Sequence, residues 1–470
     1  MEKHIPLFQF RWPVSLKIRG QVACGSFPEQ ITLMTYFRLP RPVNLLIVSG
    51  LLLVLSSCDV APSPEEHPDP NVEGIEKQVQ EILGEQVTAF QIREIDVAEL
   101  TEQLQAGEAQ VPIATPDTEM VESQMEARPA NLRPDSVATG VLRQGPETAE
   151  RVPLPPERSF VVGQCGQGGA VPCGGLTILD QDQTMLRGFV KHSDFGSSFI
   201  QSVNHVLGTD QHPNLHVVYN VKHTEPPVFS EEESPKPDYP ESEIGKASSK
   251  IEGKTSVVLD GDVEFYEINP NTVWRRQESL LLAVRLTTQL IEPNTSDTWK
   301  LELTVAGQEV WTSGGPSTDN GEDLINRLED PGYYLLHSLS KKQMHLFLLG
   351  YDVANPENGS LDYGLLGKAG GIGHKKGGWG RWSRAPTSVT DNHLFSEARS
   401  SQSWYLKATT LTHEVGHLIG GLHGKAISSG CSGSSCGRSI MNGTANGNEE
   451  FFFSDDNDQR INTVIDATLP

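Results

Sequence analysis

The sequence HEVGHLIGGLH at residues 413–423 decides the fold of the C-terminal part of the chain. His413 and His417 are four residues apart, so on a helix they lie on one face, one turn apart. Their imidazole nitrogens can then bind a single tetrahedral metal ion. Glu414 follows the first histidine, and its carboxylate would lie beside the open metal position, where it can accept a proton and return it to a leaving group.

A third histidine, His423, cannot reach the same ion along a continuing helix. Gly420 and Gly421 give the backbone the freedom to end the helix and turn the chain back. The stretch therefore predicts one zinc ion held by His413, His417 and His423. The alternative interpretation is a pair of satisfied core histidines on a buried helix.

A methionine follows in a short polar turn, SIMNG at residues 439–443. By itself Met441 would be an ordinary core methionine. Beside the histidine motif it resembles the Met-turn of the metzincin metalloproteases, and the surrounding chain resembles their reprolysin-like (adamalysin) branch. The resemblance implies an α/β (α+β) zincin fold with a mixed twisted sheet and an active-site helix. It also implies zinc endopeptidase activity, with Met441 underlying the metal ligands without binding the ion.

The resemblance is nearly continuous over residues 256–470, which are predicted as the catalytic domain. We expect strands at residues 256–266, 299–305 and 344–349, and helices at about 273–291, 321–328, 403–418 and 454–467. This order predicts an α/β sheet with crossover helices. By family resemblance, the glycine-rich residues 361–373 form the sheet edge that faces the cleft, where a peptide can add as a strand. An ordinary loop is the alternative.

The last predicted helix begins with acidic residues. Ser454, with Asp455 and Asp456 in the first turn, is typical of a capped helix start. Calcium binding by these carboxylates is the alternative, and nothing else in the sequence supports it. We therefore expect helix capping.

The N-terminal part of the chain contains an apolar segment, VNLLIVSGLLLVL, at residues 43–55. It is too short to span a bilayer comfortably but suits the central region of a signal peptide. The following sequence, ending in Cys58, resembles the lipobox of bacterial lipoproteins, which implies acylation of Cys58 and a lipid anchor. Asp59 resembles an inner-membrane retention signal. A short buried strand or helix with a chance cysteine is the alternative.

These features predict the boundaries of the N-terminal segments. The signal peptide is predicted at residues 34–57, and residues 1–33 are interpreted as a non-native extension that precedes the true start at Met34. Residues 58–89 are predicted as a tether that carries a short amphipathic helix. We expect the protein in the bacterial cell envelope, lipid-anchored and facing outside the cytoplasm, or secreted.

Residues 90–225 resemble, weakly, the propeptide that precedes reprolysin-like catalytic domains. Short apolar runs at residues 186–190, 198–201 and 215–219 are typical of a small β-rich unit. We expect little packed structure in the Pro-rich residues 107–156. Residues 226–255 are predicted as an acidic, exposed linker that a processing protease can cut, releasing the C-terminal part.

Cys165 with Cys173, and Cys431 with Cys436, form two close pairs among the six cysteines. This spacing predicts local disulfides in an exported protein. Metal binding by each pair is the alternative, although neither is a CxxC motif and neither has a histidine cluster of its own. Because no cysteine is obviously free to bind the zinc, we expect latency through occupancy of the cleft by the chain, without a thiolate.

The composition limits the function classes. A net charge of −24 and the absence of a basic stripe argue against nucleic-acid binding. The expected partners are protein or peptide substrates and, through the lipid anchor, a membrane. Two alternatives to a zinc endopeptidase are a catalytically silent metzincin-fold lipoprotein that acts as a binding module and another HExxH metal hydrolase. His423 and Met441 disfavour the second.

Overall fold

The structure is a computed structural model of the chain, which divides into two units, Met1–His67 and Pro68–Pro470. All described residues belong to the second unit. They are residues 70–83, 87–115, 120–145, 148–164, 173–180, 182, 184–192, 196–221, 229–230, 251–268, 271–289, 299–315, 343–350, 353–355, 362–365, 367–369, 376–377, 381–382, 387–391, 404–423, 439–441, 444–445 and 453–468. The predicted signal peptide, Cys58, Asp59, Cys165, Cys431, Cys436 and the predicted helix at 321–328 lie outside the described residues.

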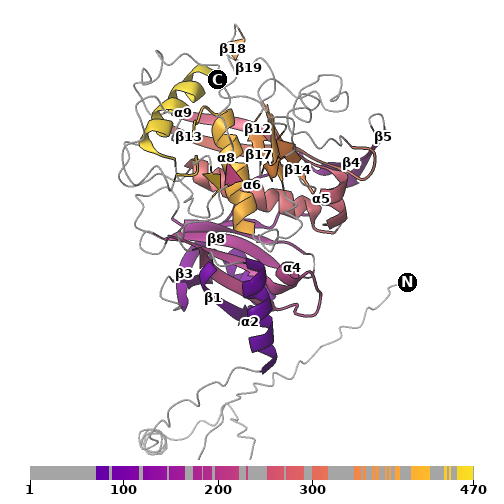
Figure 1. The fold of residues 1–470 in the computed structure, drawn as a ribbon, viewed down its shortest axis with the longest axis vertical. Coiled ribbons are helices and arrows are strands. Elements are labelled where there is room, and N and C mark those ends of the chain that lie inside the picture. The colour runs from indigo at the N-terminus through magenta and orange to yellow at the C-terminus, as the bar shows by residue number, and fades with distance from the viewer. Residues whose placement is uncertain are drawn as a thin grey trace, which may run out of the picture. The chain divides into compact units, whose positions relative to one another are not determined.

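The N-terminal region forms an antiparallel sheet of eight strands in the order β1-β10-β9-β8-β7-β6-β3-β2. Figure 1 shows β1, β3 and β8 of this sheet in indigo to magenta. The strands are β1 (Val87–Glu94), β2 (Glu108–Ala114), β3 (Met120–Pro129), β6 (Ser159–Gly163), β7 (Cys173–Ile178), β8 (Leu186–His192), β9 (Gly196–Ser202) and β10 (Leu215–Val221). Three helices accompany them: α2 (Pro70–Leu83), α3 (Val97–Ala106) and α4 (Val203–Leu207). Strands β8, β9 and β10 contain the three apolar runs that the sequence predicted.

The two faces of this sheet bury different cores because side chains alternate along a strand. Val190 and Ile200 point to one face and pack in a core that includes Leu104 of α3. Phe189 and Phe199 point to the opposite face and pack in a second core that extends into the C-terminal region. The sheet therefore shares one of its two cores with the part of the chain that carries the histidine motif.

The prediction of little packed structure at residues 107–156 is wrong. This range contains β2, β3, β4 (Thr139–Gly145) and β5 (Thr148–Pro153). In β2, Ala109, Val111 and Ile113 are buried and alternate with polar residues or proline, which is the pattern of a half-buried strand. The alternation was present in the sequence, but the prolines and polar residues around it concealed the signal. Helix α2 confirms the amphipathic helix predicted within residues 58–89, and the start of β1 also lies in that range.

A second sheet of seven strands carries the C-terminal region, in the order β17-β20-β14-β12-β13-β4-β5. Its remaining strands are β12 (Ile251–Gly261), β13 (Trp299–Trp311), β14 (Gln343–Leu349), β17 (Gly367–Ala369) and β20 (Thr387–Asp391). Neighbours from β20 to β4 are parallel, whereas β17 and β5 pair antiparallel at the two edges. With its helices this is the mixed α/β architecture that the sequence predicted.

The strand predicted at residues 256–266 ends earlier in the structure. Strand β12 stops at Gly261, and residues 263–268 form helix α5 (Val263–Ile268). The carboxylate of Asp262 accepts hydrogen bonds from the backbone N–H groups of Phe265, at 2.6 Å, and Gly350, at 2.8 Å. Burial raises the pKa of Asp262 well above its ordinary value, although these two N–H groups oppose the shift. A helix-capping aspartate therefore ends the strand.

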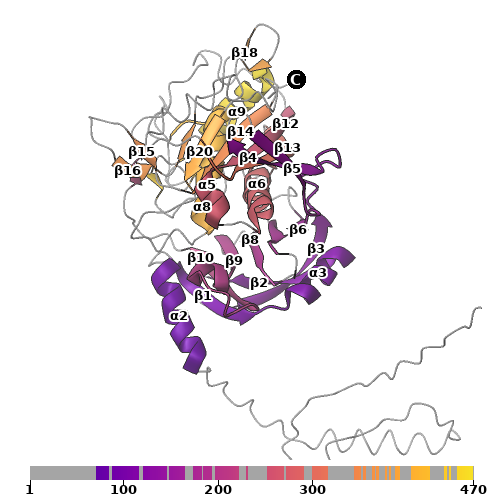
Figure 2. The ribbon, with the colours of Figure 1, turned by 90° about the vertical axis from the view of Figure 1, so that its right-hand side faces the viewer.

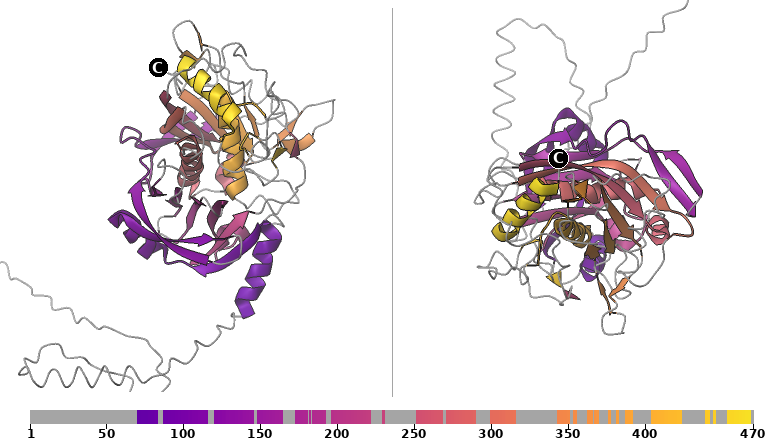
Figure 3. Two further views of the ribbon diagram at one scale, coloured as in Figure 1. Left: turned by 90° about the vertical axis from the view of Figure 1, so that its left-hand side faces the viewer. Right: turned by 90° about the horizontal axis from the view of Figure 1, so that it is seen from above.

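Helices α6 (Val273–Gln289) and α8 (Trp404–Leu418) lie between the two sheets (Figure 2). Helix α6 contacts β13 on one side and β7 on the other, and it also packs against α8. The left view of Figure 3 shows both helices above the curved N-terminal sheet. Helix α9 (Asp455–Thr468) contacts β12 and β13. Within the part of the chain that the structure describes, no helix has both the length and the apolar character needed to cross a membrane.

The N-terminal and C-terminal regions also share the second sheet. The hairpin β4–β5 extends it, because β4 pairs with the end of β13 from Glu309 to Trp311. A buried ion pair joins Arg143 of β4 to Glu309 of β13. The Arg133 guanidinium also lies 3.3 Å from a carboxyl oxygen of Glu278 of α6, whose pKa burial raises to about 8. The two regions are thus joined by backbone pairing, by a common apolar core and by buried charges.

Candidate metal centre

Helix α8 carries the first two histidines of the motif, and the N-terminal sheet holds its first turn. The side-chain Oε1 of Gln201 in β9 accepts a hydrogen bond from the backbone N–H of Trp404, at 3.1 Å. The indole of Trp404 packs against Phe189 and Phe199, with ring centroids 5.9 and 6.1 Å away. The start of the helix is therefore fixed by residues about 200 positions earlier in the chain.

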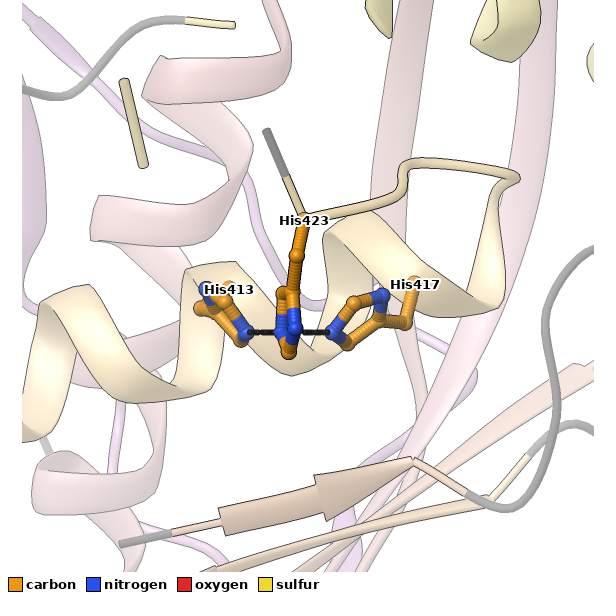
Figure 4. Close-up of side chains that lie close together, drawn as sticks. All are labelled: His413, His417 and His423. Carbon is orange, nitrogen blue, oxygen red and sulfur yellow. Dashed lines mark hydrogen bonds between the residues drawn. The ribbon is translucent and has the colours of Figure 1, made fainter. Parts of the chain in front are cut away.

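His413, His417 and His423 converge on one point (Figure 4). The Nε2 atom of His413 lies 3.0 Å from that of His417 and 3.1 Å from that of His423, and the third separation is 3.0 Å. All three side chains are almost completely enclosed. The structure thus brings together the three residues that the sequence predicted as metal ligands.

The hydrogen bonds behind the rings set the tautomers of two of these histidines. Nδ1–H of His413 donates to the carbonyl of Ile440 at 2.7 Å, and Nδ1–H of His417 donates to the carbonyl of Gly421 at 2.9 Å. With the proton on Nδ1, a neutral imidazole presents a bare lone pair at Nε2. Lone pairs that face each other at about 3 Å repel unless a cation lies between them, so the donor set fits a metal ion.

The donors suit zinc in type and spacing. In a tetrahedral site with Zn–N bonds of about 2.0–2.1 Å, two ligand nitrogens lie roughly 3.3 Å apart. The observed separations of 3.0 to 3.1 Å are close to that value. Three histidines, two of them oriented by outer hydrogen bonds at Nδ1, are also a ligand set that leaves one tetrahedral position open, as catalytic zinc sites do.

The turn that delivers His423 depends on glycine and on helix α9. Gly420 has a φ of 112°, which side chains disfavour, and a Cβ at this position would lie 2.5 Å from Val464. The side chain of Asn457 then holds both backbone groups of Leu422, accepting from its N–H at 2.8 Å and donating to its carbonyl at 3.0 Å. The sequence predicted the role of Gly420 as a helix-ending residue, but not that of Asn457.

Met441 lies directly beneath helix α8. A Cβ placed on Gly416 would lie 2.3 Å from the Met441 sulfur, and a Cβ on Gly421 would lie 3.2 Å from it. Met441 is 1% exposed, and its neighbour Ile440 supplies the carbonyl that orients His413. The methionine therefore supports the histidines from below and does not belong to the converging donor set, as the family resemblance implied.

Glu414 is buried next to the edge strand β17. A Cβ on Gly367 would lie 2.6 Å from the Glu414 Oε1 atom, so the carboxylate lies against the backbone of that strand. Helix α8 also contacts β17 and β20 along the same side. The glycine-rich segment predicted as the sheet edge thus provides β17, and Gly367 leaves room there for Glu414.

Of the four cysteines predicted to pair, one can be described. Cys173 is disulfide-bonded and lies in β7. Cys165, Cys431 and Cys436 are not among the described residues, so their pairing stays a prediction. Ser454 and Asp455 do stand at the start of α9, and Asp458 N–H donates to the Ser454 carbonyl at 2.8 Å. The side chains of Asp455 and Asp456 lie outside the described part of the structure, so the choice between helix capping and calcium binding stays a prediction.

The comparisons with known proteins agree with this site. Residues 253–453 match the reprolysin-type model of metallo-peptidase family M12. This part of the chain is thus similar to the reprolysin-like metallopeptidases, which confirms the resemblance inferred from the histidine motif. Members of such a family act on proteins or peptides, and the family implies zinc as the metal.

Two solved structures are similar to the chain at low sequence identity. Metalloproteinase-II from Bacteroides fragilis is 12% identical, with a TM-score of 0.41, over 75% of this chain and 90% of that chain. A chaperone-substrate complex is 13% identical, with a TM-score of 0.27, over 58% of this chain and 32% of that chain. A comparison with curated proteins found no match.

Proposed function

We propose that the protein is a zinc-dependent endopeptidase that hydrolyses peptide bonds with Glu414 as general base and acid. The observation that carries the proposal is the convergence of three buried histidine nitrogens within 3.1 Å of one another. A catalytically silent binding module would not need to keep three imidazole nitrogens together in a buried site. The match of residues 253–453 to a metallopeptidase family supports the same activity.

Four residues would carry the chemistry, three as metal ligands and one as the proton acceptor and donor. His413, His417 and His423 would hold the zinc, which when bound supplies Lewis acidity for the scissile carbonyl and for the attacking water. Glu414 follows the first ligand and is enclosed, so its carboxylate can take a proton from that water and return it to the leaving amine. Low exposure strengthens this role, because bulk water does not compete for the carboxylate.

Strand β17 supports an extended binding mode for the substrate. It lies at the edge of the seven-stranded sheet, and its one partner among the described strands is β20. An edge strand presents free backbone groups with which a peptide can pair. Because Gly367 of this strand lies against Glu414, a peptide added there would pass the general base.

The direct test replaces Glu414 by glutamine in the full-length protein. Glu414→Gln should retain zinc by metal analysis and lose peptide hydrolysis by a factor of about 10²–10⁴, since general acid–base catalysis contributes that much. Glu81→Gln, an exposed glutamate of α2, serves as the matched control and should keep both zinc and activity. Near-normal turnover by zinc-loaded Glu414→Gln would refute the role of Glu414. No peptide hydrolysis by the zinc-loaded wild type would favour the silent binding module.

We further propose that the protein is made as a latent precursor. Strand β11 (Phe229–Ser230), in the predicted linker, pairs with β21 (Thr444–Ala445) and contacts β16 (Asp362–Leu365). Strand β21 comes shortly after Met441, and β16 comes shortly before Gly367. Strand β11 thus lies beside two segments that flank the metal centre in the sequence, which supports occupancy of the cleft by the chain.

A single peptidase assay tests this latency. Protein cleaved within residues 231–250 should be more active than the intact chain, because the cut frees the segment that contains β11. Equal activity before and after cleavage would rule out latency. Activation by the double substitution Cys165→Ser/Cys173→Ser alone would instead reveal a thiol switch.

The proposed location outside the cytoplasm rests on the sequence of residues 34–59. A lipid on Cys58 would anchor the protein to a membrane surface of the bacterial envelope. Cys58→Ala should therefore move the protein from the membrane fraction to the soluble or secreted fraction. Unchanged partitioning with membranes would show that the lipobox interpretation is wrong.

A further inference from the structure

Helix α6 packs on the N-terminal sheet through β6, β7 and β8 (Figure 2). A cluster of basic side chains lies in this region, well apart in the sequence from the histidine motif. Arg187 belongs to β8, His205 to α4 and Arg276 to α6. Arg187 is 2% exposed and Arg276 is 8% exposed, while His205 is partly buried. Three basic side chains thus share a buried region in a chain that carries 61 acidic and 37 basic residues.

The guanidinium of Arg187 is enclosed without hydrogen-bond partners at two of its nitrogens, Nε and Nη2. Among the described residues, the groups whose charges act on Arg187 are Arg276 and Tyr219. Arg276 carries the same sign of charge, and a tyrosine phenol is ordinarily neutral near pH 7. Arg187 is therefore a buried cation that no described residue neutralises.

Arg276 and His205 do not supply the missing negative charge. Nη2 of Arg276 lies 3.0 Å from Nδ1 of His205, and Nη1 lies 3.4 Å from Nε2. Because a neutral imidazole has one acceptor nitrogen, it can accept only one of these hydrogen bonds. Burial lowers the pKa of Arg276 to about 9, so this guanidinium still carries its charge at neutral pH.

The imidazole of His205 is held neutral by its surroundings. Burial, and then the positive charges of Arg276, Arg187 and Lys407, lower the pKa of His205 well below its ordinary value. Lys407 lies on α8 and is partly buried. It adds positive charge to this region, but it also interacts with another group, so we do not include it in the proposed site. Positive charge therefore accumulates here from three elements of the fold.

Burying like charges together is costly unless an opposite charge compensates them. A buried arginine cannot escape the cost by losing its proton at neutral pH. The cluster also lies near the N-terminus of α8, since Gln201, the cross-strand neighbour of Arg187, binds the backbone N–H of Trp404. The dipole of a helix N-terminus favours an anion as well.

We propose that Arg187, Arg276 and His205 form a binding site for a small inorganic anion, chloride or phosphate. The enclosure of Arg187 limits the ligand to a small ion, and its unpartnered Nε–H and Nη2–H groups are the donors that such an ion accepts from. Because the three residues come from β8, α4 and α6, the bound ion joins the N-terminal sheet to the region that carries the metal centre.

The test measures thermal unfolding of the full chain at constant ionic strength. Gluconate, a large organic anion, is replaced stepwise by chloride or by phosphate. The wild type should show a saturable rise in Tm of about 2–4 °C with the ion that binds. A response to chloride identifies a halide site, and a response to phosphate identifies an oxyanion site. If Tm in chloride and in phosphate is the same as in gluconate, the proposal is overturned.

Substitution of the unpartnered arginine sharpens the test. Arg187→Met should raise Tm in gluconate, because it removes an uncompensated buried charge, and should abolish the response to the anion. Arg93→Met, at an arginine of β1 whose side chain is 42% exposed, is the matched control and should keep the full response. An undiminished response in Arg187→Met would overturn the proposal.

A second measurement applies even if Arg187→Met does not fold. Crystals of the wild-type chain grown in bromide should show an anomalous peak between Arg187 and Arg276 if the ion is a halide, and crystals grown in phosphate should show density for that ion if it is an oxyanion. A carboxylate of the chain itself in this position, or the absence of both signals, would overturn the proposal.

Discussion

The Oε1 atom of Gln201 accepts a hydrogen bond from the backbone N–H of Trp404 at 3.1 Å, across 203 residues of sequence. Trp404 is the first residue of α8, the helix that carries His413, Glu414 and His417. The N-terminal sheet therefore caps the active-site helix with one of its own side chains. The phenol of Tyr219 approaches the same Oε1 atom at 3.4 Å, which adds a second donor to the cap.

Removing this cap should weaken the start of α8. Gln201→Ala is expected to lower the free energy of unfolding by about 1 kcal/mol, as loss of a helix cap does. It should also reduce peptidase turnover, since the histidines and Glu414 follow on the same helix. Urea unfolding and a peptidase assay measure the two effects. Gln110→Ala, at an exposed glutamine of β2, is the control, and equal effects from both substitutions would contradict the capping role.

A methyl group at Gly416 should disturb the metal centre. The added Cβ would lie 2.3 Å from the Met441 sulfur and 2.9 Å from a ring carbon of Phe453. Gly416→Ala is expected to cost about 1–3 kcal/mol of stability through overpacking, and to lower zinc retention because His417 is the next residue.

The contrasting control is Gly74→Ala in helix α2, where nothing lies within 4 Å of the added Cβ. This substitution should stabilise the helix by about 0.5–1 kcal/mol and leave the zinc content unchanged. Thermal unfolding with metal analysis measures both variants. If Gly416→Ala lowers neither the thermal stability nor the zinc content, the conclusion that Met441 supports the metal centre is wrong.

Stability should fall as the pH rises through the range in which Glu278 titrates. Burial raises the pKa of Glu278 from 4.5 to about 8, and outweighs the attraction of Arg133 3.3 Å away. Between these two pKa values the folded state keeps a proton that the unfolded state has released. The free energy of unfolding contributed by this group is therefore highest below about pH 4.5 and is lost progressively towards pH 8.

Glu278→Gln should remove this pH dependence of the free energy of unfolding. The dependence amounts to a few kcal/mol, since each unit of pKa shift contributes on the order of 1.4 kcal/mol. Urea unfolding at pH 5 and pH 8.5 compares the wild type, Glu278→Gln and the exposed control Glu81→Gln. The wild type and Glu81→Gln should lose stability between these pH values by more than Glu278→Gln does. Parallel pH profiles for all three proteins would show that Glu278 does not titrate in this range.

Cleavage of the linker should leave the two regions associated in native buffer. They share the pairing of β4 with β13, the apolar core around Trp404, the buried Arg143–Glu309 ion pair and the contact between Arg133 and Glu278. Size-exclusion chromatography of protein cut within residues 231–250 should therefore show one peak that contains both fragments, and denaturant should separate them. Elution of the C-terminal fragment alone in native buffer would support the simple release expected from the sequence.

The metal centre could be predicted from the sequence because its geometry is local. Helix periodicity places His413 and His417 on one face, and Gly420 reverses the chain within three residues of His423. The strand at residues 299–305 was predictable for the same reason, since buried and partly exposed residues alternate along β13.

The partners of the site could not be predicted in this way. Gln201 and Gly367 reach α8 through the tertiary fold, and no spacing in the sequence relates them to it. Asn457 lies in a helix whose ends were predicted, but its bonds to Leu422 depend on how α9 packs against the turn. The end of β12 at Gly261 was missed because the capping carboxylate of Asp262 is followed by residues that also suit a strand.

The hairpin β4–β5 has a consequence for how the chain folds as it is made. Residues 139–153, which form β4 and β5, leave the ribosome before residues 299–311, which form β13. Strand β4, which pairs with one edge of β13, is therefore already made when β13 emerges. Parallel pairing is slow because its contacts are far apart in the sequence, and an uncovered hydrophobic edge invites intermolecular pairing meanwhile. A fragment that begins at Ile251 would expose that edge of β13. Aggregation of such a fragment during expression would then reflect a missing neighbour in the sheet, and would say nothing about its active site.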